Sequence, residues 1–283
     1  MNYKTLQIFV RQGVSVIWMN RPEVRNAFNE TMIAELTQAF KAADAEQGVR
    51  AVVLAGHGPA FCAGADLNWM KKMSGYSAKE NLADAMALAA MLNTIYMMKK
   101  PTVARVHGPA FAGGMGLVAA CDIAIAAQEA EFCLAEVKLG LTAATISPYV
   151  VAAIGERHAR RYFLSAERFT AAEAFRIGLV HDIVPMAELD ASVNALLGHL
   201  LLASPAAIAA SKELIRSVAR GAIDQDMIAG TAARIAAARA SADGKEGIRS
   251  FLEKRTPSWA ETKAKATKGA KDTKEKQSRT RKP

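Results

Sequence analysis

The order of apolar and polar residues divides this chain into a first half rich in strands and a second half that is helical. Apolar residues alternate over residues 6–10 and 14–18 around a polar turn, which predicts a hairpin within residues 1–20. Largely apolar runs predict three further strands, at residues 49–54, 102–106 and 122–126.

Helical spacing predicts the segments between these strands. Asn29 is placed to cap a helix that carries Ile33, Leu36 and Phe40 on one face, and residues 79–98 form a Met- and Ala-rich helix. Because strand, turn and helix recur in this order, we expect an α/β architecture with parallel strands joined by helices.

From about residue 145 the chain is mainly helical. Thr170 and Glu173 have the spacing of a capping box, Gly178 is placed to end that helix, and Pro205 suits the first turn of another. The Ala-rich helices over residues 186–254 have little core of their own, so we expect them to pack on another subunit.

Charge sets the last residues apart. The chain has 283 residues and a net charge of +9, of which residues 261–283 carry +6 from nine Lys and Arg and three acidic residues. That segment has no aromatic or branched aliphatic side chain, so we expect a disordered, solvated tail, with weak contact to nucleic acid as the alternative. The expected organisation is a core at residues 1–195, a helical region at residues 196–260 and this tail.

Hydropathy and cysteine usage bear on location. Hydrophobic residues make up 51% of the chain, yet no apolar run reaches the roughly 18 residues of a membrane span, and the N-terminus lacks a signal-peptide pattern. Cys62, Cys121 and Cys133 have no metal-ligand spacing. We therefore expect a cytoplasmic protein without membrane or metal, in which the cysteines are small core residues.

Two Gly- and Ala-rich turns carry the candidate chemistry. Residues 61–67 and 113–116 each follow a β-rich segment and open a helix, and their small side chains leave backbone N–H groups accessible. One N–H from each turn, aimed at the same point, would hold a carbonyl oxygen that becomes negative during reaction. The pair predicts acyl-thioester chemistry through an enolate; the alternative is two ordinary tight turns.

A carboxylate, Glu136, lies beyond the second turn. Its apolar neighbours Leu134, Val137 and Leu139 predict partial burial, which would raise its pKa toward the working range of a general acid or base. The alternative is a surface glutamate in a loop. Asp66 directly follows the first turn, a position typical of a helix cap rather than a catalyst.

These features make the chain resemble the crotonase superfamily of enoyl-CoA hydratases and isomerases. The resemblance covers residues 3–256 and rests on the two turns, Glu136 before Leu139-Gly140, and the segments Asn20-Arg21-Pro22, Asn26-Ala27-Phe28, His107 to Ala110 and Cys121-Asp122-Ile123. It implies a crotonase-like α/β spiral of repeated strand–strand–helix turns with a C-terminal helical trimerisation region. It also implies a homotrimer or a dimer of trimers.

The resemblance further implies roles for particular residues. It makes Ala65 and Gly113 the donors of the two oxyanion-hole N–H groups and Glu136 the catalytic carboxylate. The residues that it implies for binding the CoA part of an acyl-CoA substrate are Arg25, Ala27, Ala63, Asp66, Leu67, Phe251 and Lys254. Coenzyme A enters as part of the substrate, and no other cofactor is expected.

One departure from the family pattern affects the reaction. Gly116 stands where two-glutamate hydratases carry their first carboxylate, which leaves Glu136 either to hydrate a 2-enoyl-CoA or to shift a double bond between the 3- and 2-positions. Residues 134–141 and 144–151 resemble bacterial methylglutaconyl-CoA hydratases of leucine breakdown, which favours hydration of a branched or carboxylated acyl-CoA. A non-catalytic protein whose basic tail binds RNA is the third hypothesis.

Overall fold

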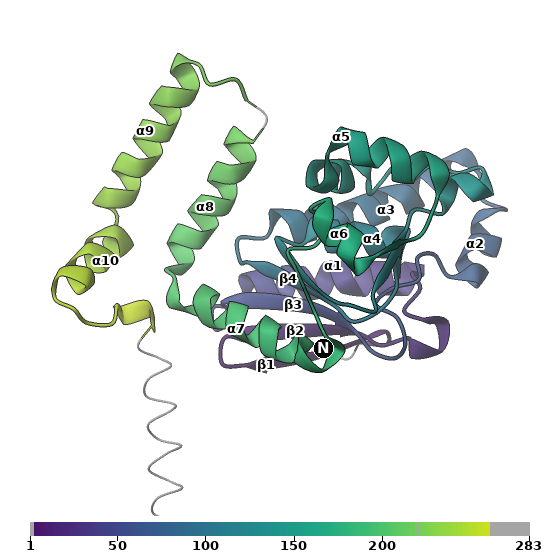
Figure 1. Cartoon of the computed structure of the whole chain (residues 1–283), viewed down its shortest axis with the longest axis horizontal. Helices are drawn as coiled ribbons and strands as arrows, with labels where there is room; N and C mark the ends of the chain where they lie inside the picture. Colours follow the sequence, from purple (N-terminus) through teal and green to yellow (C-terminus); the bar gives the residue numbers. More distant parts are fainter. Residues whose placement is uncertain (1–2, 220, 261–283) are drawn as a thin grey trace, which may run out of the picture. The chain divides into compact units, whose positions relative to one another are not determined.

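The computed structural model describes residues 3–219 and 221–260. These residues fall into two compact units, one that extends to Leu197 and one that begins at Gly198 (Figure 1). The tail predicted at residues 261–283 lies outside the described residues.

The first unit is built on a six-stranded sheet in the order β1-β2-β3-β4-β6-β9. Its strands are β1 (Leu6–Arg11), β2 (Val14–Met19), β3 (Ala51–Gly56), β4 (Thr102–Val106), β6 (Ile123–Ala127) and β9 (Asp182–Val184). β1 and β2 form the predicted antiparallel hairpin, and the later neighbours pair in parallel. Gln12 and Gly13 make the hairpin turn with φ of 51° and 80°, the left-handed conformation that matches the twist of the strands.

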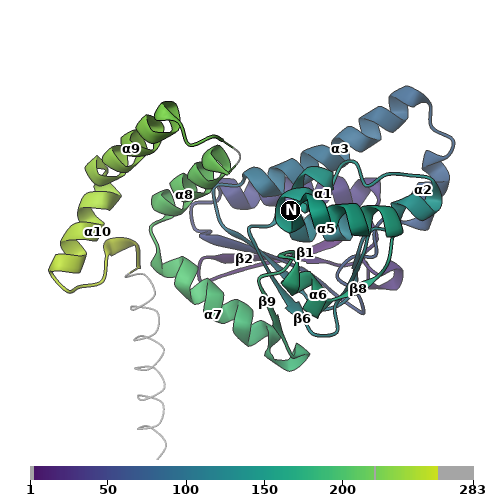
Figure 2. The ribbon, with the colours of Figure 1, turned by 45° about the horizontal axis from the view of Figure 1, so that its top comes forward.

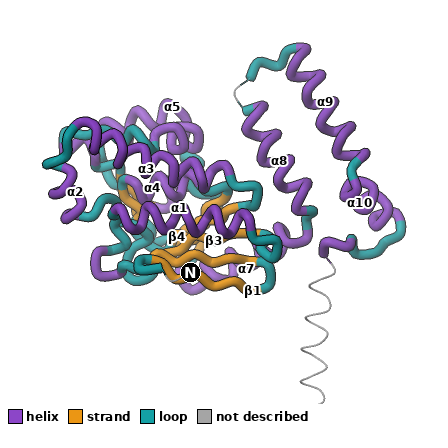
Figure 3. Tube along the Cα trace, turned by 180° about the vertical axis from the view of Figure 1, so that it is seen from behind, coloured by secondary structure: helices purple, strands orange, loops and turns teal. Residues whose placement is uncertain are grey.

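The inner strands of this sheet are apolar and buried, whereas the edge strand β1 is largely exposed. All six residues of β3 are buried, as expected for a parallel strand that is covered on both faces. Helices α1 (Glu30–Ala45) and α3 (Ala78–Met97) pack on each other, and Figure 3 shows them on one side of the strands. The predicted cap is confirmed, because the Asn29 side chain accepts a hydrogen bond from the Met32 N–H at 2.9 Å.

Three short strands form a second sheet that the sequence analysis missed. β5 (Ala110–Phe111) pairs in parallel with β7 (Glu131–Cys133), and β7 pairs antiparallel with β8 (Phe169–Thr170). Two or three residues are too few for an alternation of apolar side chains to be recognised. This sheet matters for the site, because it places Phe111, just before the second turn, opposite Cys133, just before Glu136.

Helical segments of the first unit that follow the second predicted turn are α4 (Gly113–Ala120), η2 (Glu136–Leu139), α5 (Ser147–Ser165) and α6 (Ala171–Arg176). Thr170 caps α6 by accepting from the Glu173 N–H, as predicted. The other half of the predicted capping box is wrong, because the Glu173 carboxylate binds Arg176 and Tyr162 instead of reaching back to Thr170. The charged guanidinium group of Arg176 and the phenol O–H of Tyr162 are stronger hydrogen-bond donors to this carboxylate than a backbone N–H.

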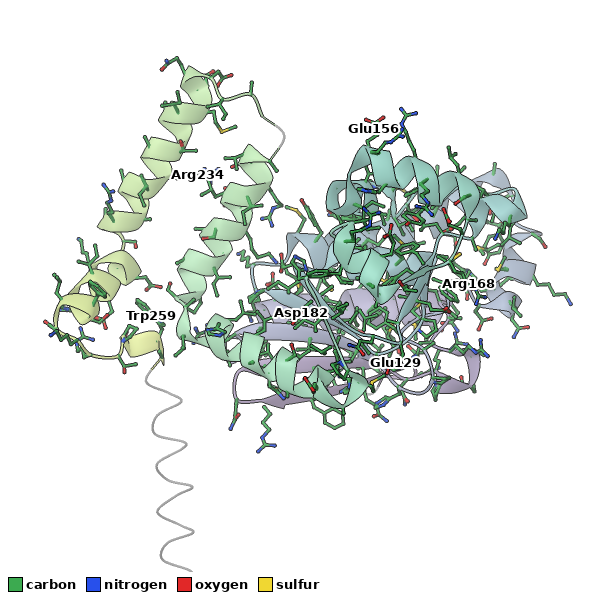
Figure 4. All side chains as sticks on the ribbon, viewed as in Figure 1. Glu129, Glu156, Arg168, Asp182, Arg234 and Trp259 are labelled. Atoms are coloured by element: carbon green, nitrogen blue, oxygen red, sulfur yellow. The ribbon has the colours of Figure 1, made fainter. Side chains whose placement is uncertain are left out.

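The second unit is helical, as predicted, and begins at Gly198, within α7 (Leu189–Leu202). It contains α8 (Pro205–Val218), α9 (Gln225–Ala240) and α10 (Ala242–Leu252). Arg234 pairs with Glu213 at 3.0 Å, and the indole N–H of Trp259 donates to the Leu202 carbonyl at 3.1 Å; Figure 4 labels Arg234 and Trp259. Large apolar side chains stay exposed on this unit, among them Ile215, Ile223, Ile228, Ile235, Phe251 and Leu252.

Two further findings concern membranes and thiols. Within residues 3–219 and 221–260, no single helix is long and apolar enough to cross a membrane; one bent pair, residues 186–202 with 205–218, meets the length and composition test together. The three cysteines are buried, as predicted for small core residues, and no disulfide joins them in the described part of the chain. Burial raises the pKa of the Cys62 thiol to about 12, so this thiol is a packing group.

Candidate active site

The first predicted donor turn runs extended beside Phe28. The Phe28 N–H donates to the Gly64 carbonyl at 2.6 Å, and the Asp66 N–H donates to the Phe28 carbonyl at 2.8 Å. Since alternate residues of an extended chain direct their polar groups to opposite sides, the Ala65 N–H points away from Phe28. No acceptor in the described part of the chain binds the Ala65 N–H.

The second predicted turn places Gly113 at the start of α4. Ala112 precedes it with φ 49° and ψ −121°, a strained conformation for a residue with a side chain. Ala112 is held there by its N–H, which donates to the Cys133 carbonyl at 2.8 Å. The first N–H groups of a helix have no carbonyl one turn earlier, and none of the described residues accepts from the Gly113 N–H.

The two turns lie directly against each other. A Cβ on Gly64 would lie 3.0 Å from the Ala112 Cβ, and a Cβ on Gly114 would lie 2.4 Å from the Cys62 carbonyl oxygen. That same oxygen accepts from the Phe111 N–H at 2.9 Å. The backbone of one turn thus fills the space beside the other, which explains why glycine is required at both positions.

Glu136 is tied to the second turn through the small sheet. Cys133, whose carbonyl holds Ala112, comes three residues before it. The Glu136 side chain is half-buried, and its Oε2 atom is buried with no hydrogen-bond partner among the described residues. Burial raises the pKa of Glu136 above the ordinary 4.5, opposed by a smaller effect of its own backbone N–H. A poorly solvated carboxyl group with one unpartnered oxygen is suited to exchanging protons near neutral pH.

Gly116 lies one helical turn after Gly113 on α4, and Ile146 fills the space beside it. A Cβ on Gly116 would lie 2.2 Å from Ile146 Cγ2 and 2.7 Å from Ile146 Cβ. Ile146 is only 2% exposed, so its side chain has no other place to go. Because residue 116 is glycine, this position supplies no carboxylate to act together with Glu136.

The predicted CoA-binding residues of the first unit flank the first turn. Arg25 is exposed, has φ 55°, and accepts from the Ala63 N–H through its carbonyl at 3.0 Å. Ala27 is buried, whereas Leu67, the first residue of α2 (Leu67–Met73), is 81% exposed. Figure 2 shows α2 and the first half of α3 at one edge of the first unit. Contact of these residues with CoA stays a prediction.

Asp66 is buried, and its carboxylate is already engaged. It accepts from the Asn68 and Trp69 N–H groups, as the predicted cap of α2, and pairs with Arg21 at 2.7 Å. Burial by itself would raise the pKa of Asp66, but the bonds from Arg21 and the two N–H groups outweigh it and hold the pKa below its usual range. The cap is confirmed, and contact with CoA stays a prediction.

The sequence analysis uses the Asn-Arg-Pro and Asn-Ala-Phe segments only as a family signature and misses what their side chains do. The Asn26 amide accepts from the Arg21 N–H at 2.9 Å and donates to the His57 and Ala60 carbonyls at 2.8 Å each. Arg21 also donates to the Ala27 carbonyl at 2.6 Å. These bonds fasten the segment before Phe28 to the loop that leads into the first turn.

Phe251 and Lys254 belong to the second unit. Phe251, near the end of α10, is 82% exposed, and Lys254 follows with φ 53°. Their contact with CoA also stays a prediction.

Comparison with known proteins agrees with this geometry. The family model for enoyl-CoA hydratase/isomerase matches residues 10–263. This chain belongs to the enoyl-CoA hydratase/isomerase family. A crotonyl-CoA hydratase of Syntrophomonas wolfei is 32% identical over 257 residues, which cover 90% of this chain and 97% of that relative.

Solved structures of the family share the fold. A crystal structure of an enoyl-CoA hydratase from Shewanella pealeana superposes with a TM-score of 0.88 at 43% identity, covering 90% of this chain and 96% of that one. One from Mycobacterium smegmatis gives a TM-score of 0.84 at 32% identity, covering 90% and 98%. The predicted crotonase fold and the prediction of an enoyl-CoA hydratase-type enzyme are confirmed.

Proposed function

We propose that this protein adds water across the double bond of a 2-enoyl-CoA thioester. In this proposal the Ala65 and Gly113 N–H groups bind the thioester oxygen, and Glu136 moves the protons. The observation that carries it is the contact between two turns whose donor N–H groups have no other acceptor in the described chain. Preorganised donors of this kind stabilise a developing oxyanion, and loss of one typically costs about 10²–10³ in turnover.

In this reaction Glu136 carries out both proton transfers, and the two N–H groups stabilise the negative oxygen formed between them. The Glu136 carboxylate takes a proton from water while the water oxygen bonds to the β-carbon of the substrate. The electron pair of the double bond moves toward the thioester, whose oxygen becomes an enolate oxygen bound by the two N–H groups. The α-carbon then takes the proton from the Glu136 carboxyl group, which restores the thioester and the carboxylate.

The finer proposal is a branched acyl group, with methylglutaconyl-CoA as the first candidate. It is supported by the resemblance of residues 134–141 and 144–151 to methylglutaconyl-CoA hydratases. Exposed apolar side chains beside Glu136, namely Val137, Leu139 and Leu141, suit an acyl chain with apolar branches.

We also propose assembly as a homotrimer or dimer of trimers, supported by the exposed apolar side chains of the second unit. A cytoplasmic location, and a reaction that needs no cofactor beyond the CoA of the substrate, stay predictions.

The test follows the absorbance of the conjugated thioester over a panel of straight, branched and carboxylated 2-enoyl-CoA substrates. Glu136→Gln should lower kcat by about 10²–10⁴-fold while the thioester still binds. The matched control is Glu131→Gln, because Glu131 lies nearby on β7 but its side chain is 45% exposed and pairs with Arg168, which Figure 4 labels, at 3.7 Å. An unchanged kcat in Glu136→Gln contradicts the proposal.

A parallel assay with 3-enoyl-CoA separates the isomerase alternative. Isomerisation creates the conjugated thioester and its absorbance, whereas hydration consumes it. Conversion of the 3-enoyl substrate without consumption of any 2-enoyl substrate assigns the protein to isomerisation.

A further inference from the structure

Phe28 contacts both predicted donor segments. Its backbone forms two hydrogen bonds on either side of Ala65, one to the Gly64 carbonyl at 2.6 Å and one from the Asp66 N–H at 2.8 Å. Its ring lies against the other segment, because a Cβ on Gly113 would lie 2.6 Å from Phe28 Cε2 and 3.0 Å from Cδ2. One buried residue, 1% exposed, therefore touches the chain at both donors.

Hydrogen bonds made by the residues before and after Phe28 fix its position. Asn29, directly after it, caps α1, and Ala27, directly before it, is held through its carbonyl by Arg21. The backbone position of Phe28 is thus fixed from both sides. Its ring has few other rotamers open to it in a close-packed interior.

We infer that Phe28 is a positioning residue that sets the separation and direction of the Ala65 and Gly113 N–H groups. The inference rests on the proposed function, because it needs both N–H groups to bind the same oxygen. The backbone of Phe28 directs the Ala65 N–H, and the edge of its ring limits how closely the start of α4 approaches. A carbonyl oxygen accepts two donors only within a narrow range of positions, so a change in this spacing weakens binding of the enolate oxygen.

The first test compares two equivalent truncations. Phe28→Leu shortens the side chain between the two donor segments, whereas Phe40→Leu shortens a phenylalanine on α1 that is 0% exposed and whose backbone forms no hydrogen bond to either turn in the described part of the chain. Both variants should lose stability to a similar degree. Phe28→Leu should also lower kcat by on the order of tenfold to a hundredfold with KM little changed, because the missing interaction develops in the transition state. Phe40→Leu should keep the kcat of the wild type.

The second test uses the contact itself. Gly113→Ala places a methyl group against Phe28 Cε2 and should lower kcat, and Phe28→Leu removes that atom. In the double variant the two defects should partly cancel. Its kcat relative to wild type should exceed the product of the relative kcat values of the two single variants by at least about threefold. The same pair measured by denaturant unfolding should show the same partial rescue, which reports the contact independently of turnover.

Two results overturn the inference. One is an equal kcat in Phe28→Leu and Phe40→Leu when both variants are folded to the same extent. The other is a double variant whose kcat relative to wild type equals the product of the relative kcat values of the two single variants. Either result leaves the proposed function standing as long as Glu136→Gln abolishes hydration. A Glu136→Gln variant with full activity instead removes the proposed function itself.

Discussion

Replacing Gly116 with alanine adds one methyl group at a position that Ile146 already fills. The new Cβ would lie 2.2 Å from Ile146 Cγ2 and 2.7 Å from Ile146 Cβ. Both atoms are close to the backbone of a buried residue, so they move aside only if the chain shifts. Overpacking of this kind costs about 1–3 kcal/mol. Alanine in place of glycine inside a helix gains about 0.5–1 kcal/mol. We therefore expect Gly116→Ala to lose roughly 0.5–2 kcal/mol of unfolding free energy.

The assay is denaturant unfolding of the wild type, the single variants Gly116→Ala, Gly198→Ala and Ile146→Ala, and the double variant Gly116→Ala/Ile146→Ala. Gly198→Ala is the matched control, since Gly198 lies in α7 and an added Cβ there has no atom within 4 Å. It should gain about 0.5–1 kcal/mol. The double variant Gly116→Ala/Ile146→Ala, which lacks the Cγ2 atom, should be more stable than the sum of its single changes predicts. If the unfolding free energy of Gly116→Ala equals that of the wild type, or rises as that of Gly198→Ala does, contact with Ile146 is not the reason that residue 116 is glycine.

Two further predictions concern the strained and titrating groups of the site. Because the folded protein holds the Glu136 proton more tightly than the unfolded chain does, this group stabilises the fold at low pH, and the contribution is lost as pH rises from the ordinary 4.5 through the raised folded pKa. The unfolding free energy of Glu136→Gln relative to wild type should therefore increase with pH across that window, and a constant difference argues against burial of the carboxyl. Ala112→Gly should raise Tm in calorimetry, because relief of the strain at φ 49° is worth about 1–3 kcal/mol against about 0.5–1 kcal/mol for the freer unfolded chain. A lower Tm in Ala112→Gly contradicts the prediction that the backbone of Ala112 is strained.

Features that depend on neighbouring residues were predictable from the sequence. The Asn29 and Asp66 caps form between residues two or three apart, and the Gln12-Gly13 turn needs only the alternation on either side of it. The two small-residue turns were visible for the same reason, because a glycine followed by a helix signal is a local pattern. Partial burial of Glu136, with its raised pKa, agrees with the prediction, but Val137 and Leu139, two of the three neighbours on which that prediction rested, are themselves exposed.

Features that depend on distant residues were decided by the tertiary structure. β5 and β7 are too short to be recognised alone and exist because Phe111 meets Cys133 in register. Glycine is required at 64 by its φ of 93° and the nearby Ala112 Cβ, at 114 by the Cys62 carbonyl oxygen, and at 116 by Ile146. The sequence by itself determined which turns present backbone N–H groups and which carboxyl is partly buried. Only the fold decided that the turns touch each other and that Phe28 contacts both of them, because contacts between segments far apart along the chain leave no periodic trace in either segment.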